Sequence, residues 1–220
     1  MVTTTVVPAT AMATSSRLAS ARGAVAVALL AGAVAVAVLL SGGRSGHAVA
    51  PAVEPQPSAL LASLRPAPAP SGWPVATIPS GAATLHRPPA WSAVEGDSGT
   101  VSFALRDAEG RYHGYLNVTP RQGGERLRGW AAFRLARNRE EGDRGVRELA
   151  AREGVAFAGA RGSCVIDDYA SRAGGNPYRE LACMVRGPRT ESVLIAAALR
   201  PDWSRLAPSL TRAAEAFAER

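Results

Sequence analysis

Lysine is absent from this chain of 220 residues, and all 25 of its basic side chains are arginines. A phosphate-binding P-loop is therefore excluded, because that motif depends on a lysine. Two cysteines are too few for a disulfide-dense scaffold or a four-cysteine zinc site. The three histidines, His47, His86 and His113, show no paired spacing with other ligand residues, so we expect no metal site and no cofactor. An apolar content of 47% excludes a wholly disordered chain.

Acidic residues are absent before Glu54, and no charge of either sign lies between Arg22 and Arg44. The uncharged stretch, residues 23–43, consists largely of Gly, Ala, Val and Leu. As a helix rising about 1.5 Å per residue, it would span roughly 30 Å, the thickness of a bilayer core. Positive charge before it favours a cytoplasmic tail over residues 1–22 and export of the remainder. We therefore predict a single-pass membrane anchor over residues 23–43.

The same segment allows a second interpretation, the core of a cleaved signal peptide. The tripeptide Ala48-Val49-Ala50 fits the small-x-small pattern of a cleavage site. Two observations favour the anchor: Pro51 follows directly, where we expect it to hinder the peptidase, and the apolar run exceeds the usual core of about 7–15 residues. Both alternatives export the rest of the chain, as a membrane-anchored or as a secreted protein.

Residues 51–80 hold eight of the 16 prolines, together with alanine and serine. This composition favours an extended, polyproline-like backbone and is unsuited to building a core. We expect a Pro/Ala-rich linker or stalk over residues 51–80. The composition then turns globular, and the remaining length of about 140 residues suits a single domain over residues 81–220.

Strand and helix signals alternate along the domain. The expected elements are strands over 82–87, 91–95, 100–106 and 112–118, helices over 127–137 and 143–154, strands over 163–171, 176–186 and 192–199, and a helix over 202–220. Asp143 is expected to cap its helix and Gly154 to end it, and Pro208 suits a first turn of the last helix. This order predicts an α+β fold in which an antiparallel sheet packs against helices.

The segment Ser163–Arg186 predicts a hairpin, because a turn signal occupies its centre at residues 172–175. With those four residues as the loop, the opposed pairs are Cys164 with Cys183, Ile166 with Leu181, Asp168 with Arg179, and Tyr169 with Tyr178. One pair argues against this register: Asp167 would face Glu180, a like-charge contact that an arginine on a neighbouring strand would offset. In an oxidising compartment the opposed cysteines predict a disulfide, and two buried thiols are the alternative.

Two groups of residues allow a catalytic interpretation. Ser98 stands in a Gly-Asp-Ser-Gly sequence like that around the nucleophile of trypsin-like proteases. A triad also needs a histidine base, and only His86 precedes the serine in the domain, so a polar turn is the simpler interpretation. Asp167, Asp168 and Glu180 form a group of acids that would serve acid–base catalysis or bind a cation. The simpler alternative is a salt-bridged sheet surface.

The net charge of +7 suggests a nucleic-acid partner until its distribution is considered. Residues 1–72 carry four arginines and one glutamate, and these charges bear on how the chain is oriented in the membrane. In the remainder, arginines alternate with acids in stretches such as 137–153. A nucleic-acid-binding face requires clustered basic residues, so we expect no nucleic-acid partner.

A further set of residues carries a family resemblance: Pro89 with Trp91, Gly110, the strand Tyr178–Val185, and Trp203, Pro208, Leu210 and Phe217 near the C-terminus. In this order the domain resembles the PsbP-like α/β family, which includes actinobacterial cell-envelope lipoproteins. The resemblance covers about residues 81–219 and brings no catalytic residues. The chain lacks the lipidated cysteine of those lipoproteins, which the predicted anchor would replace. Its lysine-free, Ala/Arg-rich composition is typical of a high-GC actinobacterium.

These observations predict a single-pass membrane protein whose extracytoplasmic domain binds a protein or ligand of the cell envelope. On this hypothesis the domain is not an enzyme. The alternative is an envelope hydrolase that uses Asp167 and Glu180, or Ser98.

Overall fold

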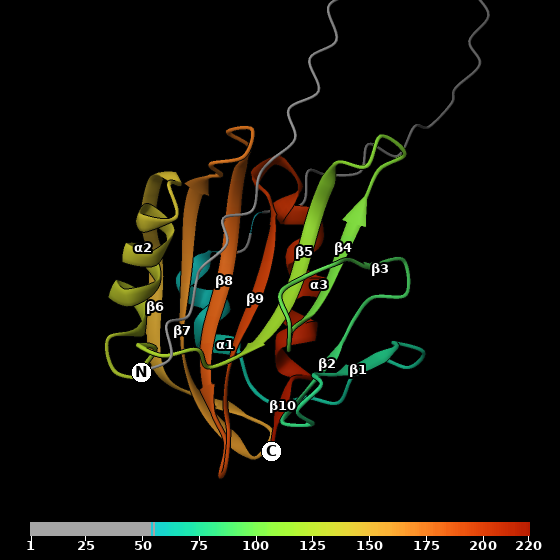
Figure 1. Cartoon of the computed structure of the whole chain (residues 1–220), viewed down its shortest axis with the longest axis vertical. Helices are drawn as coiled ribbons and strands as arrows, with labels where there is room; N and C mark the ends of the chain where they lie inside the picture. Colours follow the sequence, from blue (N-terminus) through green and yellow to red (C-terminus); the bar gives the residue numbers. More distant parts are fainter. Residues whose placement is uncertain (1–53, 55) are drawn as a thin grey trace, which may run out of the picture. The chain divides into compact units, whose positions relative to one another are not determined.

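The computed structural model describes residue 54 and residues 56–220. Most strands join one sheet: β3 (Ser92–Ala93), β4 (Val101–Arg106), β5 (Tyr112–Pro120), β6 (Arg144–Phe157), β7 (Ala160–Ala170), β8 (Pro177–Arg186) and β9 (Glu191–Leu199). Their order across the sheet is β3-β4-β5-β9-β8-β7-β6, with every neighbour antiparallel (Figure 1). A smaller sheet holds β1 (Val75–Thr77), β2 (Ala83–His86) and β10 (Ala218–Glu219) in the order β1-β2-β10.

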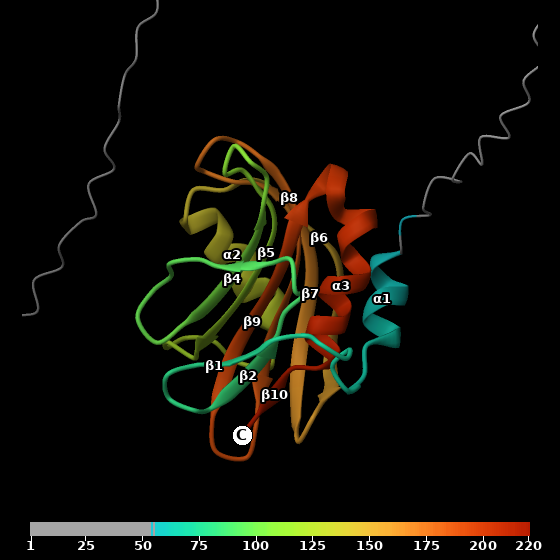
Figure 2. The same ribbon diagram turned by 90° about the vertical axis from the view of Figure 1, so that its right-hand side faces the viewer.

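In the part of the chain that the structure describes, three α-helices cover the two faces of the large sheet. They are α1 (Pro57–Ser63), α2 (Trp130–Glu140) and α3 (Trp203–Glu215), the last preceded by the 3-10 turn η1 (Arg200–Asp202). Helices α1 and α3 lie on one face and α2 lies on the other (Figure 2). The predicted α+β class, an antiparallel sheet packed against helices, is therefore confirmed for the described residues.

Because successive strand residues point to opposite faces, the central strands β7, β8 and β9 contribute to two cores. The core beneath α3 includes Ile166, Leu181, Leu194, Trp203, Leu210 and Phe217. The core beneath α2 includes Val165, Ala182, Ile195, Trp130 and Leu135. The apolar strand predicted over 192–199 is β9, the middle strand of the seven.

The hairpin of β7 and β8 has the predicted register, with Ile166 opposite Leu181, Asp168 opposite Arg179, and Asp167 opposite Glu180. Cys164 and Cys183 lie opposite each other with their Cα atoms 4.1 Å apart, and they form the predicted disulfide. Tyr169 and Tyr178 stack with their ring centroids 5.9 Å apart. Complementary cross-strand pairs therefore specify this hairpin, as the sequence indicated.

The helix predicted over 143–154 is wrong, because these residues belong to the 14-residue strand β6. Its pairing with β7 shifts register three times along its length. Each shift adds a residue and breaks the alternation of a strand, so apolar residues recur at a spacing that resembles a helix. Gly154, expected to end the helix, lies at one of these shifts with a φ of +70°. Glycine adopts that backbone conformation without strain.

The C-terminal helix is confirmed over Trp203–Glu215, but its predicted extension to residue 220 is wrong, because Ala218–Glu219 form strand β10. The expected place of Pro208 in the first turn of the helix is also wrong. Pro201 is the second residue of the preceding turn η1, and α3 starts directly after that turn at Trp203. Pro208 therefore lies inside α3, where it has no N–H to donate to the carbonyl of Ser204. The proline side chain is exposed, which keeps this interruption on the solvent side of the helix.

The interpretation of residues 51–80 as a linker without core is wrong for part of that range. Leu60, Leu61 and Leu64 follow a helical spacing, and all three are buried in the core beneath α3. Ile78 is buried in the same core. The folded domain therefore begins well before residue 81.

The predicted tail over 1–22 and anchor over 23–43 lie outside the described residues. Within residue 54 and residues 56–220, no helix combines the length and the apolar character needed to cross a bilayer.

Candidate functional site

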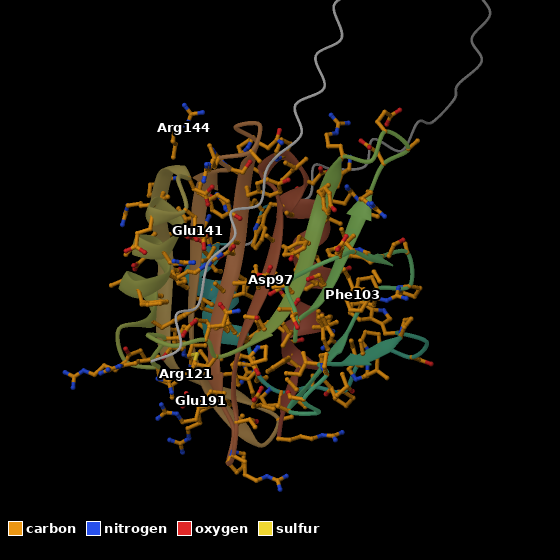
Figure 3. All side chains as sticks on the ribbon, viewed as in Figure 1. Asp97, Phe103, Arg121, Glu141, Arg144 and Glu191 are labelled. Atoms are coloured by element: carbon orange, nitrogen blue, oxygen red, sulfur yellow. A yellow bond between two sulfur atoms is a disulfide. The ribbon has the colours of Figure 1, made fainter. Side chains whose placement is uncertain are left out.

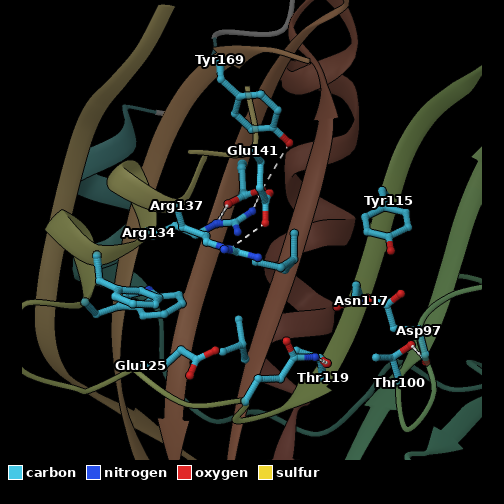
Figure 4. Close-up of a pocket in the computed structure, with 16 residues that line it drawn as sticks. Asp97, Thr100, Tyr115, Asn117, Thr119, Glu125, Arg134, Arg137, Glu141 and Tyr169 are labelled. Carbon is cyan, nitrogen blue, oxygen red and sulfur yellow. Dashed lines mark hydrogen bonds and ion pairs between the residues drawn. The ribbon is translucent and has the colours of Figure 1, made fainter. Parts of the chain in front are cut away.

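A pocket opens on the α2 side of the large sheet. Helix α2 packs over β6, β7 and β8, and it leaves β9 and β5 less covered. The cavity between α2 and β5 has a volume of about 320 Å³ (Figure 4). Its lining comes from separate segments of the chain. They are the loop residues Asp97, Thr100, Gln122 and Glu125, the β5 residues Tyr115, Asn117 and Thr119, four residues of α2 with Glu141 directly after it, and the residues Tyr169, Glu180, Val193 and Ile195 of β7, β8 and β9.

The floor and walls of this pocket differ in chemistry. Val193 and Ile195 of β9 form an apolar floor. On the β5 side, the Asn117 amide nitrogen donates to the hydroxyl of buried Ser102 over 2.8 Å, and the Tyr115 hydroxyl donates to the same oxygen over 3.2 Å. These bonds fix both side chains and leave the Asn117 carbonyl oxygen without a partner in the described part of the chain. Small-molecule sites commonly combine such an apolar surface with a few fixed polar groups.

The opposite wall is held by a buried ion pair between α2 and the sheet. Arg134 donates from Nε and from an Nη to the two carboxylate oxygens of Glu180, over 2.7 and 2.9 Å. The side chain of Glu180 is only 1% exposed. The Tyr169 hydroxyl also donates to Glu180 over 3.3 Å. An arginine therefore offsets the like-charge contact between Asp167 and Glu180, as predicted, but it comes from a helix and not from a neighbouring strand.

Asp167, directly opposite Glu180, is fully buried. Burial and the neighbouring carboxylate of Glu180 raise the pKa of Asp167 to about 8. Asn138 donates from its amide nitrogen to Asp167 Oδ2 over 3.0 Å, while Asn138 Oδ1 and Asp167 Oδ1 have no partner in the described structure. Both of these oxygens lack a hydrogen-bond donor. A protonated Asp167 carries an O–H group that would supply one, so the missing donor agrees with a neutral carboxyl group.

Asp167 makes the stability of the fold depend on pH. Its pKa is about 8 in the folded protein and about 4 in an unfolded chain. Between these values the folded state holds one more proton, so the free energy of unfolding falls as pH rises, by up to about 1.4 kcal/mol per pH unit. We expect Asp167→Asn to remove this contribution and to be more stable than the parent at pH 8. Urea unfolding at pH 5, 6, 7 and 8 measures the difference in slope.

A matched control for this prediction is Asp97→Asn, which removes an exposed carboxylate at the same pocket. The control should keep the slope of the parent protein. Equal slopes for the parent and Asp167→Asn would show that Asp167 is ionised in the folded state.

Ser98 stands apart from any histidine base in the described structure. It is exposed in the turn before β4, and it makes no hydrogen bond to a histidine there. Both ring nitrogens of His113 contact carboxylates, Nδ1 with Asp202 over 2.6 Å and Nε2 with Asp107 over 3.0 Å. These contacts, first with Asp202 and then with Asp107, raise the pKa of His113. The geometry of a serine triad is therefore not assembled around Ser98.

Asp168, the third acid of the predicted group, points to the other face of the sheet. Arg179 donates to it over 2.7 and 3.1 Å, and Arg147 donates over 3.1 Å. Glu54 in turn contacts Arg179. The fold thus brings Asp167 and Glu180 together and separates Asp168 from them. Among the described residues, no group of three or more His, Cys, Asp or Glu side chains is placed to hold a metal ion.

Sequence reasoning did not identify the pocket itself. Its signal is the alternation along β5, where Tyr115, Asn117 and Thr119 point to one face and buried Leu116 and Val118 to the other. Polar and aromatic residues on an inner strand suggest a partly open face. No comparable pattern in the sequence indicates that α2 forms a wall of the pocket, because this depends on how the helix packs against the sheet.

No protein-family profile matches the chain, and no curated protein is similar to it in sequence. The fold has weak likenesses among solved structures. Cyanobacterial PsbP (CyanoP) from Synechocystis is 15% identical, with a TM-score of 0.47, over 67% of this chain and 92% of its own. LpqN, involved in cell envelope biogenesis of Mycobacterium tuberculosis, is 13% identical, with a TM-score of 0.39, over 70% of this chain and 88% of its own.

A third solved structure, from Bacteroides thetaiotaomicron, is 11% identical with a TM-score of 0.43. It matches 66% of this chain, which spans about half (48%) of that protein's length. The resemblance to PsbP-like and envelope proteins predicted from the sequence is thus present and weak. Similarity this distant assigns no function.

Proposed function

We propose that this chain is a single-pass membrane protein whose extracytoplasmic domain binds a component of the cell envelope. The apolar stretch over residues 23–43 and the arginines before it support the anchor and its orientation. The disulfide between Cys164 and Cys183 supports an oxidising compartment for the domain, since such bonds persist outside the cytosol.

The pocket between α2 and β5 is the observation that carries the binding role. It combines an apolar floor with the fixed side chains of Tyr115 and Asn117. Its arginines are already engaged, Arg134 with Glu180 and Arg137 with Glu141 over 2.8 Å. Further carboxylates line the pocket, so it disfavours an anionic ligand. The chemistry suits an uncharged or cationic polar group, such as a sugar unit of an envelope polymer.

Binding is favoured over hydrolysis by the burial of the paired acids. Asp167 is fully buried and Glu180 is held by two hydrogen bonds from Arg134. A glycosidase-type mechanism needs both carboxyl groups beside the bond to be broken, one of them next to water. Here they tie α2 to the sheet and stiffen the pocket wall.

Crosslinking in living cells tests this proposal. The photoreactive amino acid p-benzoyl-phenylalanine replaces Phe133, which lines the pocket, in the full-length chain. We expect light to produce a discrete adduct, identified by mass spectrometry, in which the partner is an envelope component. Adding Asn117→Ala should lower its yield at least threefold without changing the amount of protein.

The matched control places the same amino acid at Arg212, on the exposed surface of α3 beyond the other face of the sheet. It should give no such adduct. Adducts of equal yield at both positions, or only with cytoplasmic proteins, would contradict the proposal.

A further inference from the structure

One end of the large sheet gathers arginines from distant parts of the sequence. We define the basic end as seven arginines, all exposed: Arg121, Arg126, Arg128, Arg161, Arg186, Arg189 and Arg220. They come from the loop after β5, the beginning of β7, the end of β8, the β8–β9 turn and residue 220. Figure 3 shows Arg121 at this end and Arg144 at the opposite end.

Two of these arginines lie in an unfavourable arrangement. Arg161 of β7 and Arg186 of β8 are directly opposite in the antiparallel pairing, so their side chains leave the same face of the sheet. Like charges in directly opposite positions destabilise a sheet. Arg186 contacts Glu191, but Arg161 forms no ion pair in the described structure. An anion bound between the two guanidinium groups would relieve this repulsion.

Nearby acids balance only part of the charge. Glu191 is shared, because Arg121 donates to it over 2.8 Å and Arg186 also contacts it. Glu125 accepts the Gly123 N–H, and Glu153 accepts the Gly129 N–H. Glu219 is buried, and burial raises the pKa of its carboxyl group. The basic end therefore keeps a positive excess.

The surface at this end is hollowed on both sides of the β8–β9 turn. One hollow, of about 590 Å³, is lined by Arg121, Arg186 and Arg189 with Thr190 and the carboxylate that two of these arginines share, Glu191. The other, of about 540 Å³, is lined by Arg161 and Arg186 with apolar residues. Because Arg186, Gly187 and Pro188 line both, the two hollows are adjacent. Such a double site suits an extended ligand with repeated negative charges better than a single small ion.

We infer that the basic end binds an anionic polysaccharide of the cell envelope, independently of the pocket beside α2. Arginine recognises carboxylate and phosphate groups through paired hydrogen bonds, which fits either type of charged sugar polymer. A membrane surface is a poorer match, since the exposed large apolar side chains of the described residues, Val75 and Tyr112, line neither hollow. Glu54, the first described residue, contacts Arg179 at the opposite end of β8.

Binding to defined polymers tests the inference with the purified full-length protein in detergent. The probes are fluorescent polygalacturonate, which carries carboxylates, and fluorescent polyphosphate, with neutral dextran as the uncharged polymer. We expect one or both charged probes to bind, with affinity falling at least tenfold between 50 and 500 mM salt (about 14 and 4 Å of screening length). Dextran should not bind. Binding of polyphosphate alone would indicate phosphate-bearing polymers, and binding of polygalacturonate would indicate carboxylate-bearing ones.

The decisive variant is Arg161→Gln/Arg189→Gln, which removes one arginine from each hollow. We expect its affinity for the charged probe to fall about tenfold or more. The matched control Arg144→Gln/Arg172→Gln removes two exposed arginines at the opposite end of the sheet and should change affinity less than twofold. Equal losses in the two variants would overturn the inference. So would tighter, Arg161-dependent binding of anionic lipid vesicles or duplex DNA.

A stability measurement distinguishes a lost site from a damaged fold. Because Arg161 faces Arg186, Arg161→Gln should leave the melting temperature unchanged or raise it while binding weakens. The adduct formed through Phe133 should persist in this variant, so failure at the basic end is separable from failure of the proposed pocket function.

Discussion

Replacing Arg134 with methionine is expected to lower the free energy of unfolding by about 3–5 kcal/mol. Among the described residues, Arg134 is the only positive charge that contacts the carboxylate of Glu180, which stays buried beside Asp167 when the arginine is replaced. Glu180 would keep only the 3.3 Å hydrogen bond from Tyr169, and a buried carboxylate without a counter-charge is strongly destabilising. Urea unfolding of the purified protein at pH 7, followed by circular dichroism, measures the loss.

The control for this prediction, Arg137, lies three residues after Arg134, about one turn further along α2. Arg137→Met removes an arginine that is 53% exposed and pairs with Glu141 at the surface. Its cost should stay below about 1 kcal/mol, the usual limit for an exposed ion pair. Arg134→Met/Glu180→Leu should recover much of the stability lost in Arg134→Met, because it leaves no buried charge unpaired. A similar loss for Arg134→Met and Arg137→Met would contradict the assigned role of Arg134.

Removing the disulfide is also expected to lower the free energy of unfolding by a large amount. Cys164→Ala/Cys183→Ala opens a loop whose ends are 19 residues apart in sequence. In the chain-entropy description a loop of this size contributes about 3 kcal/mol, and the loss of two buried sulfurs adds to it. The measurement is urea unfolding with and without dithiothreitol.

Dithiothreitol should destabilise the parent protein and leave the double-alanine variant unchanged. This comparison separates the bond from the packing of the sulfur atoms. The prediction would be contradicted if the reductant is shown to free both thiols of the parent protein and the unfolding midpoint still does not change.

The β7–β8 hairpin was predictable because its information is local. A short turn signal sets the loop, and the pairing then follows from complementary residues at fixed separations, as with Cys164 and Cys183. The two central acids were also placed correctly opposite each other. Their environment was not predictable, since Arg134 reaches Glu180 from a helix 46 residues away in sequence.

Strand β6 and helix α1 show why other parts of the fold escaped prediction. In β6 the three register shifts disturb the period of two, so an irregular strand imitates a helix. In α1, prolines obscure a short leucine-rich helix that is stabilised by burial against the domain rather than by its own propensity. Both errors arise where tertiary contacts outweigh local preference.

The distribution of charge separates what each level of description decides. The sequence alone determines the absence of lysine, the uncharged run over residues 23–43, and the pairing of the cysteines within one hairpin. It also suggested that arginines are interspersed with acids, as they are along residues 137–153. Only the tertiary structure gathers seven exposed arginines at one end of the sheet. In an antiparallel sheet, every second turn lies at the same end of the strands. The same packing seals Asp167 and Glu180 beneath α2 and leaves a pocket beside them.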